Sequence, residues 1–370
     1  MRHGALMLAV LAATTMGVVI TPGVAGATEA PAPPNATCSQ QTVAVAISPT
    51  DPTPYNLSGQ LCLKDDNLRG SRAVMVMVSG VTYDRSYFNS SYQPYTYSWV
   101  YTATIHGYST FNIDRLGVGQ SSRPAAELLT VQNHAYTVEQ VVRKLRVGKI
   151  GGRSFSTVIG IGHSLGAGVL QYLSGTVTDP AGVPDFLVFS GWLHQGNPAA
   201  LASLGAALYP ASSDPGLVSS GYPTGYLTTQ PNSRGSNFYH TPGADPAMIA
   251  LDEATKQTGT LEERQTLAAV RASTVTSTIT VPVLLSVGHY DTLQCNEAIG
   301  LTCATGPAVR TREASYYGPR ACLAAFVVPD TGHSVNLHYK GQDTYNYVNN
   351  WLDDYTINRP GSRDANGCLL

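Results

Sequence analysis

A serine between two glycines is the residue pattern in this chain best suited to covalent chemistry. The sequence GHSLG at 162–166 places Ser164 directly after an apolar run, Ser156–Ile161, and directly before a helical pattern over Leu165–Leu173. G-x-S-x-G between a strand and a helix predicts a sharp turn that strains the serine backbone and exposes its hydroxyl. Chance alone produces this pattern in some glycine-rich chains, so the strand before it and the helix after it carry the prediction.

A serine alcohol needs a base to accept its proton, and that base needs a carboxylate to orient it. Asp291 follows the apolar run Val283–Val287, and His333 follows the later run Cys322–Val328. Because ligand and catalytic groups collect at the carboxyl edge of an open α/β sheet, we expect both to lie near Ser164. We therefore predict Ser164 as the nucleophile, His333 as the general base and Asp291 as the orienting acid.

Other residues compete for these roles. His289 and His338 are expected near the same edge, while His163 adjoins the serine but points elsewhere if the turn forms. Asp330 lies three residues before His333 and is more typical of a turn residue. For His333 itself, the alternative is an ordinary solvent-exposed loop histidine.

An acyl-transfer site also needs two backbone N–H donors for the oxyanion. One is expected at Leu165, directly after the serine. The other should come from the loop after the apolar run Ala73–Val78, which reads Ser79-Gly80-Val81. Val81 is the predicted second donor.

Apolar runs alternate with helical patterns along most of the chain. Thr42–Ile47 and Leu57–Leu63 read as a hairpin, and Thr137–Leu145 reads as a helix. This alternation predicts a mostly parallel eight-stranded sheet with helices on both faces. The further predicted strands are Ala73–Val78, Ser109–Ile113, Ser156–Ile161, Phe186–Phe189, Val283–Val287 and Cys322–Val328.

The pattern changes between Gly191 and about Thr280. This stretch lacks a strong strand signal, is rich in Gly, Pro, Ser and Tyr, and contains one helical tract, roughly Asp245–Ala272. Strand signals resume after it, which favours an insertion over a separate domain. We predict a core formed by residues 38–190 and 281–370, with residues 191–280 inserted after strand six as a cap.

The first 27 residues have the features of a signal peptide. Arg2 supplies positive charge, the stretch 5–20 is apolar, and Ala25-Gly26-Ala27 fits a cleavage site. The alternative is a single membrane anchor, for which the apolar stretch is slightly short. Residues 28–37 are rich in Pro and Ala and predict a flexible segment. The expected location is therefore outside the cytoplasmic membrane.

Composition and cysteine content limit which binding partners, metals and cofactors the chain can have. A net charge of −2 offers no basic surface for nucleic acid or an anionic membrane. Six cysteines in an exported chain indicate disulfides, which allow 15 pairings. Sequence proximity favours Cys38–Cys62, Cys295–Cys303 and Cys322–Cys368. Their spacing is unlike a zinc site, and Gly117-Val118-Gly119 is too short to cradle a phosphate, so we expect neither metal nor cofactor.

Taken together, these motifs make the chain resemble the α/β-hydrolase superfamily, in its capped, esterase- and lipase-like branch. The sequence DRLGVGQS at 114–121 resembles the D-x-x-G-x-G-x-S turn of that branch and ends a predicted strand about 50 residues before Ser164. The resemblance covers about residues 70–350 and implies an α/β-hydrolase fold. This chain has Ser79-Gly80 where the family usually has His-Gly, a change that concerns the second oxyanion donor.

Aromatic residues are concentrated in two predicted loop regions, and their concentration has two possible interpretations. They either line an apolar pocket for a sizeable ester or polyketide-like substrate, or pack under long loops. One group lies after Gly80 and the other in the predicted cap. They are Tyr83, Tyr87, Phe88, Tyr92, Tyr95, Tyr97, Trp99 and Tyr101, and then Trp192, Tyr209, Tyr222, Tyr226, Phe238 and Tyr239.

The predicted activity is hydrolysis of a carboxylic ester, or of a thioester or amide, through an acyl-serine. One alternative is a lyase or cyclase of the same fold acting on a polyketide-like molecule by acetate elimination or ring formation, because the fold alone does not decide the reaction. A non-catalytic binding protein is the third hypothesis. In each case the partner is a small molecule and no nucleic acid is expected.

Overall fold

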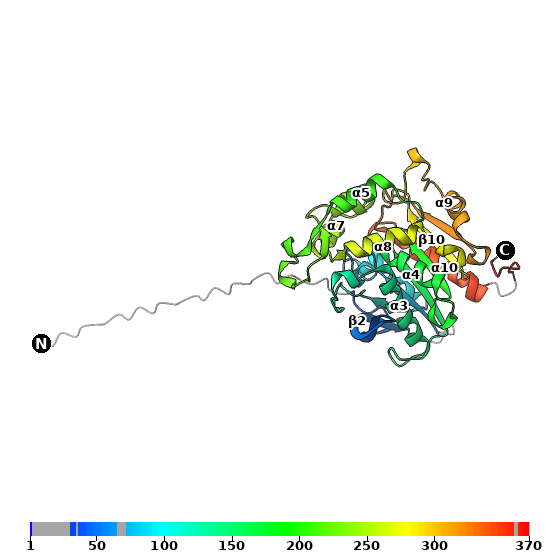
Figure 1. Cartoon of the computed structure of the whole chain (residues 1–370), viewed down its shortest axis with the longest axis horizontal. Helices are drawn as coiled ribbons and strands as arrows, with labels where there is room; N and C mark the ends of the chain where they lie inside the picture. The colour runs from blue at the N-terminus through cyan, green and yellow to red at the C-terminus, as the bar shows by residue number, and fades with distance from the viewer. Residues whose placement is uncertain (2–29, 35, 65–71, 359–361, 370) are drawn as a thin grey trace.

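The computed structural model describes Met1 and residues 30–34, 36–64, 72–358 and 362–369 (Figure 1). Apart from Met1, the predicted signal peptide at 1–27 lies outside the described residues. The first strand, β1, begins at Ala36, so it overlaps the end of the segment predicted to be flexible.

Eight strands form one sheet in the order β1-β2-β4-β3-β5-β6-β10-β11. β1 pairs with β2 and β2 with β4 in antiparallel fashion, and all the other neighbours pair in parallel. The predicted eight-stranded, mostly parallel sheet is therefore confirmed. The strands are β1 (Ala36–Ser48), β2 (Asp51–Lys64), β3 (Ala73–Val78), β4 (Ser109–Ile113), β5 (Thr157–His163), β6 (Phe186–Ser190), β10 (Val283–Gly288) and β11 (Ala324–Val328).

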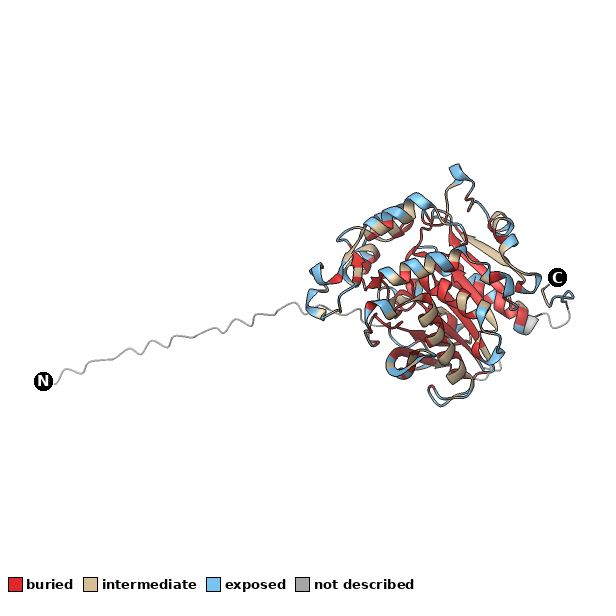
Figure 2. Cartoon of the chain, viewed as in Figure 1, coloured by how far each residue is buried: buried red, intermediate tan, exposed pale blue. Residues whose placement is uncertain are grey.

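Side chains of the central strands enter two apolar cores, one on each face of the sheet. In β3, Val74, Val76 and Val78 belong to one core, whereas Met75 and Met77 belong to the other. Successive strand residues point to opposite faces, so a continuous apolar run is what a strand covered on both sides requires. Figure 2 shows this as a buried central sheet beneath helices whose outer sides are exposed.

Helices cover both faces of the sheet. On one face α3 (Val131–Arg146) and α4 (Leu165–Thr176) pack together and against α8 (Leu261–Ala272), and on the other α2 (Trp99–Ile105) packs against α10 (Gly341–Asp353). The other α-helices described are α1 (Pro94–Tyr97), α5 (Pro198–Ala206), α6 (Arg234–Phe238), α7 (Pro246–Ala254) and α9 (Gly306–Glu313).

The insertion between β6 and β10 contains strands that the sequence pattern did not reveal. β7 (Leu208–Pro210), β8 (Tyr226–Thr229) and β9 (Gly259–Thr260) form a second, three-stranded sheet. Strands of two to four residues are too short to show a period-two pattern. The absence of a strong strand signal in the sequence is therefore compatible with these three short strands.

The helical tract expected over Asp245–Ala272 is two helices rather than one. α7 ends at Ala254, β9 follows, and α8 begins after Thr260. The Thr260 side chain accepts a hydrogen bond from the backbone N–H of Glu263, and the Glu263 side chain accepts one from the N–H of Thr260. This capping box starts a new helix at Leu261.

Many aromatic side chains of the loop after Gly80 belong to the apolar core. Tyr83, Tyr87, Phe88, Tyr97 and Trp99 are all buried in the second of the two cores. They pack beneath the long connection between β3 and β4. For these five residues the structure supports ordinary packing.

Three disulfides are present, with the pairing that sequence proximity favoured. Cys38–Cys62 joins β1 to β2, Cys295–Cys303 closes a loop after β10, and Cys322–Cys368 ties the C-terminal segment to the residues before β11. Within the described residues, none of the helices combines the length and the hydrophobicity needed to cross a membrane.

Candidate active site

Ser164 lies in the turn between β5 and α4, in a backbone conformation that serine seldom adopts. Its φ of 50° and ψ of −114° place it outside the ordinary strand and helix regions. The turn is held from behind, because the Ser164 N–H donates to the Ser190 carbonyl of β6 at 2.9 Å. The side chain is thereby turned away from the sheet.

The two glycines of the motif are required by packing in this turn. A Cβ on Gly162 would lie 2.6 Å from the backbone nitrogen of Ala167, and a Cβ on Gly166 would lie 2.0 Å from the Val78 carbonyl oxygen. Neither gap accepts a side chain without moving a backbone. α4 can therefore pack closely against β3 and β5 only with glycine at both positions.

Asp291 and His333 come from the loops after β10 and β11 and meet in a hydrogen bond. His333 Nδ1 lies 2.9 Å from Asp291 Oδ2, and both side chains are buried. The other carboxylate oxygen, Oδ1, accepts from the backbone N–H groups of Leu293 at 3.0 Å and Gln294 at 3.2 Å. The carboxylate is thus held from both ends, and it holds the imidazole in turn.

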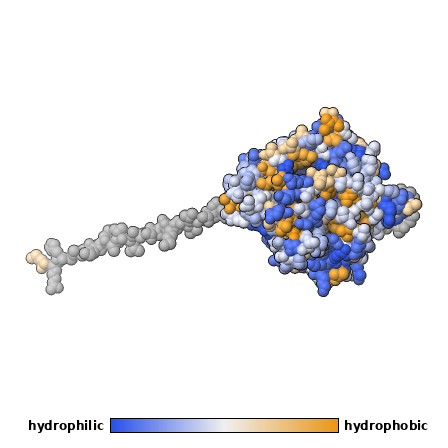
Figure 3. Space-filling view, in the orientation of Figure 1, coloured by the Kyte–Doolittle hydropathy of each residue, from blue (hydrophilic) through white to orange (hydrophobic). Residues whose placement is uncertain are grey.

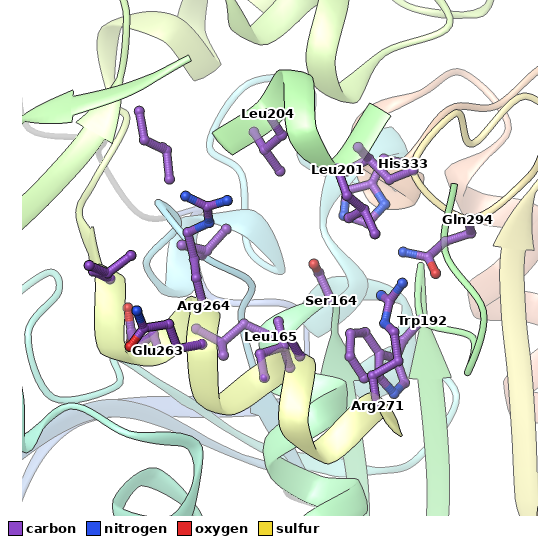
Figure 4. A pocket seen from close by; sticks show the side chains of 17 residues that line it. Ser164, Leu165, Trp192, Leu201, Leu204, Glu263, Arg264, Arg271, Gln294 and His333 are labelled. Carbon is purple, nitrogen blue, oxygen red and sulfur yellow. The ribbon is translucent and has the colours of Figure 1, made fainter. Parts of the chain in front are cut away.

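The structure brings Ser164 and His333 to the same cavity. Figure 4 shows the Ser164 hydroxyl directed toward the side of the pocket where the His333 ring lies. With Nδ1 engaged by Asp291, the ring nitrogen left for Ser164 is Nε2. The structure therefore brings together the three residues predicted as nucleophile, base and orienting acid.

The competing histidines occupy other positions. His163 Nε2 donates to the His333 carbonyl at 3.1 Å, and burial lowers the pKa of His163 well below its usual value. His338 Nε2 accepts from the backbone N–H groups of Gly332 and His240, each at 3.0 Å. His289 borders a separate surface depression.

Asp330 also lies apart from Ser164. It is exposed, has a φ of 49°, and borders the same depression as His289. A positive φ is common in turns, where aspartate tolerates it better than most residues.

The loop with the predicted second oxyanion donor lies against the serine. A Cβ on Gly80 would be 3.2 Å from the Ser164 Cβ, and both Val81 and Leu165 border the cavity. Among the described residues, neither of these two backbone N–H groups has a hydrogen-bond acceptor. Ser79 braces the loop, since its hydroxyl donates to the Tyr83 carbonyl at 3.0 Å.

A buried arginine that the sequence analysis did not single out supports this loop. Arg115 Nη2 donates to the Gly80 carbonyl at 2.9 Å, and Arg115 Nε donates to the Ser79 carbonyl at 3.1 Å. Glu263 of α8 pairs with Arg115 Nη1 at 2.5 Å and with His134 Nε2 at 2.7 Å. The sequence signal that could have indicated Arg115 is its position inside the 114–121 motif.

Asp114 fixes the start of that motif. Its carboxylate accepts from the Arg85 N–H at 2.9 Å, from Arg85 Nη1 at 2.7 Å and from the Gln120 N–H at 3.0 Å. Burial, reinforced by Asp84 and opposed by Arg85, raises the pKa of Asp114 to about 7. The Asp114 side chain therefore anchors the turn after β4, and Arg115 extends from this turn to the Ser79 and Gly80 carbonyls.

The cavity at Ser164 has a volume of about 330 Å³. The insertion supplies much of its wall, from α5, β7 and α8. In Figure 3, apolar patches interrupt the polar surface in the area where Figure 1 shows α5 and α8. The lining residues are Val81, Ser164, Leu165, Trp192, Leu201, Leu204, Leu208, Leu261, Glu263, Arg264, Gln265, Leu267, Ala268, Arg271, Leu293, Gln294 and His333.

This lining differs from the aromatic pocket considered above. Of the two aromatic groups, Trp192 alone borders the cavity within the described part of the chain. Leucines and arginines take the place that the hypothesis gave to tyrosines. Arg264, Arg271 and Gln294 had not been singled out, because nothing in their local sequence indicates that they face a cavity.

Comparison with known families identifies the chain. The profile of a family described as "Alpha/beta hydrolase family" matches residues 75–342. No curated protein sequence gives a significant match.

Several solved structures share the fold at low sequence identity. A soluble variant of monoglyceride lipase from Saccharomyces cerevisiae has a TM-score of 0.56 and 16% identity, covering 86% of this chain and 98% of that one. A monoacylglycerol lipase from Paleococcus ferrophilus has a TM-score of 0.51 and 13% identity, with 85% and 98% covered. A bromoperoxidase from Bacillus anthracis has a TM-score of 0.54 and 14% identity, with 85% and 100% covered. At these identities the similarity shows the fold alone.

Proposed function

Because the chain belongs to the alpha/beta hydrolase family, we propose that it is a serine hydrolase that cleaves carboxylic esters through an acyl-serine on Ser164. The observation that carries this proposal is the geometry around the cavity. Ser164 has a φ of 50° and shares the cavity with His333, whose Nδ1 lies 2.9 Å from Asp291 Oδ2. The lipases among the proteins of the same fold are consistent with it.

The proposed reaction uses these residues in two steps. His333 Nε2 accepts the hydroxyl proton as Ser164 Oγ attacks the ester carbonyl carbon, and Asp291 stabilises the imidazolium. The Leu165 and Val81 N–H groups stabilise the oxyanion. The imidazolium then protonates the leaving alcohol. A water molecule, deprotonated by His333, attacks the acyl-serine, and the imidazolium returns that proton to Ser164 Oγ as the acid is released. A thioester or an amide would use the same groups.

The insertion at 191–280 serves as a cap in this proposal. Leu201, Leu204 and Leu208 come from its first part and line the cavity opposite Ser164. An apolar roof lowers the local dielectric constant and so strengthens the electrostatic interactions below it, while the cavity still admits the water that hydrolyses the acyl-enzyme.

We also propose that the protein acts outside the cytoplasm. All six cysteines are oxidised in pairs, and structural disulfides persist mainly in exported proteins. N-terminal sequencing of the protein recovered from the culture medium tests this, with a new N-terminus at Thr28 expected.

Turnover of 4-nitrophenyl esters, together with labelling by a fluorophosphonate probe, tests the catalytic proposal. Ser164→Ala should abolish labelling and lower kcat by roughly 10⁴ or more, because the three residues act as a unit. Ser156→Ala is the matched control, since Ser156 is exposed just before β5. Comparable turnover by Ser164→Ala would refute the proposal. Labelling without ester turnover would instead indicate a lyase or cyclase, and neither would indicate a binding protein.

A further inference from the structure

One helix of the insertion directs two arginines into the cavity at Ser164. Arg264 and Arg271 both come from α8 and both line the cavity. They are seven residues apart, so they share a helix face and are separated by roughly 10 Å along the axis. In the view of Figure 4 their guanidinium groups lie on opposite sides of the Ser164 hydroxyl.

Arg271 is a half-buried cation that has no hydrogen-bonding or oppositely charged partner within the described residues. Within the described residues its guanidinium makes no hydrogen bond or ion pair, and its Nη1 atom is fully buried without an acceptor. Burial lowers the pKa of Arg271 to about 10, against the opposing effect of Asp291 and Glu313, so the side chain stays protonated at neutral pH. Unpaired buried cations are rare in proteins because their desolvation is uncompensated.

The other enclosed arginines show what Arg271 lacks. Arg115 is paired with Glu263 at 2.5 Å, and Arg234 is paired with Asp252 at 2.9 Å. The carboxylates that act on Arg271 electrostatically are engaged elsewhere: Asp291 holds His333, and Glu313 lies 2.7 Å from His194 Nδ1.

The guanidinium is nevertheless held in place. It stacks on the Trp192 ring, with the central carbon 4.1 Å from the ring centroid. Trp192 is itself fixed, because its indole N–H donates to Gln171 Oε1 at 2.5 Å. A cation held over an aromatic face donates at its edges; since Nη1 is buried, the N–H groups left for a ligand are those of Nε and Nη2.

A second donor lies beside Arg271 in the cavity wall. Gln294 Oε1 accepts from the Leu193 N–H at 3.2 Å, which fixes the orientation of the side-chain amide. Its Nε2 then has no acceptor among the described residues, and Figure 4 shows this nitrogen turned toward the cavity. The Arg271 guanidinium and the Gln294 amide together present N–H donors suited to binding a carboxylate.

We propose that the substrate is an ester that carries a carboxylate, which accepts hydrogen bonds from Arg271 and Gln294 while the ester carbonyl lies at Ser164. This inference rests on the proposed esterase function and names its substrate class. A planar carboxylate can accept from the accessible N–H groups of the guanidinium, and it supplies the direct counter-charge that none of the described residues provides. Arg264 adds positive charge on the far side of Ser164, so the cavity as a whole favours an anion over a neutral ester.

The test compares substrates that differ only in this charge. The 4-nitrophenyl hemiesters of succinate, glutarate and adipate are paired with neutral 4-nitrophenyl esters of the same acyl length. The wild-type protein should favour the hemiester of at least one length by roughly 10-fold or more in kcat/KM, as a charge-assisted hydrogen bond predicts. Arg271→Met should lower the ratio of kcat/KM for that hemiester to kcat/KM for the neutral ester by about 10- to 100-fold.

Arg320→Met is the matched control. Arg320 is exposed, so its loss removes the same charge away from the cavity and should change neither substrate. If Arg271→Met fails to fold, the comparison of hemiester with neutral ester on the wild-type protein still decides. Preference for the neutral ester at every length would overturn the carboxylate inference and leave the esterase proposal standing. Hydrolysis of neither kind of ester would refute the esterase proposal itself. In that case protection of Ser164 from fluorophosphonate by free glutarate tests the anion site on its own, and no protection would overturn it.

Discussion

Replacing Asp291 by asparagine should reverse the tautomer of His333 without disturbing the fold. The carboxylate accepts three hydrogen bonds, one at Oδ2 from His333 Nδ1 and two at Oδ1 from the N–H groups of Leu293 and Gln294. Asparagine has a single acceptor oxygen, and the two backbone donors require it at the Oδ1 position. The amide nitrogen then occupies the Oδ2 position and donates to His333 Nδ1. The ring proton moves to Nε2, which can no longer accept the proton of Ser164.

The hydrogen bonds set the size of this effect. Turning the amide the other way would leave the Leu293 N–H facing an NH₂ group, whereas the Gln294 N–H would keep its second acceptor, the Asp291 carbonyl at 3.1 Å. The lost Leu293 bond costs roughly 1–3 kcal/mol, so the wrong tautomer dominates by about 5-fold to 150-fold in population. The imidazolium also loses its anionic neighbour. We therefore expect kcat to fall by about 10⁴, with KM nearly unchanged because Asp291 does not line the cavity.

Steady-state hydrolysis of a 4-nitrophenyl ester and the rate of fluorophosphonate labelling both measure this loss. Asp330→Asn is the matched control, since Asp330 is exposed in a turn with a φ of 49°. It should stay within about twofold of the wild type, because changes at exposed sites away from the cavity have small effects. If Asp330→Asn removes activity while Asp291→Asn keeps more than about a tenth of it, the proposed role of Asp291 is wrong.

Three further outcomes are expected. Replacing both Cys295 and Cys303 by serine should cost about 2–3 kcal/mol in urea unfolding, with a larger proportional loss of ester turnover, because their loop begins four residues after Asp291; unchanged turnover would refute the bracing role. His338 has its pKa lowered by burial from 6.5 to about 4, so the unfolded chain binds its proton more strongly and stability should fall as the pH drops from about 6.5 to 4. His338→Asn should flatten that part of the pH profile of unfolding, and an unaltered slope would contradict the assignment. Thr260→Ala should destabilise the protein by about 1 kcal/mol through loss of the α8 N-cap; chemical denaturation that shows no change would argue against the cap.

Residues close together in the chain determined the turn at Ser164 and the central strands. The turn needs glycine at 162 and 166 because the Ala167 and Val78 backbones come within 2.6 and 2.0 Å of where a Cβ would lie. A strand buried on both faces reads as a continuous apolar run, and Ala73–Val78 is one. The contact with Ala167 and the apolar run are local, so the pattern expressed them directly, whereas the contact of Gly166 with Val78 of β3 arises only in the folded chain. The order of strands also indicated that Asp291 and His333 would end at one edge of the sheet.

The walls of the cavity were decided only by tertiary packing. The aromatic residues after Gly80 had the composition of a binding pocket, but Tyr87, Phe88 and Trp99 fill the core beneath their loop. Arg271 looks in the sequence like a solvated arginine in the last turn of a helix, where a cation is favourable. It faces the cavity because the 191–280 insertion lays α8 against α3 and α4 beside Ser164. The contact joins α8 to helices about 100 residues earlier in the chain. No periodicity within these helices encodes which side of α8 faces the cavity.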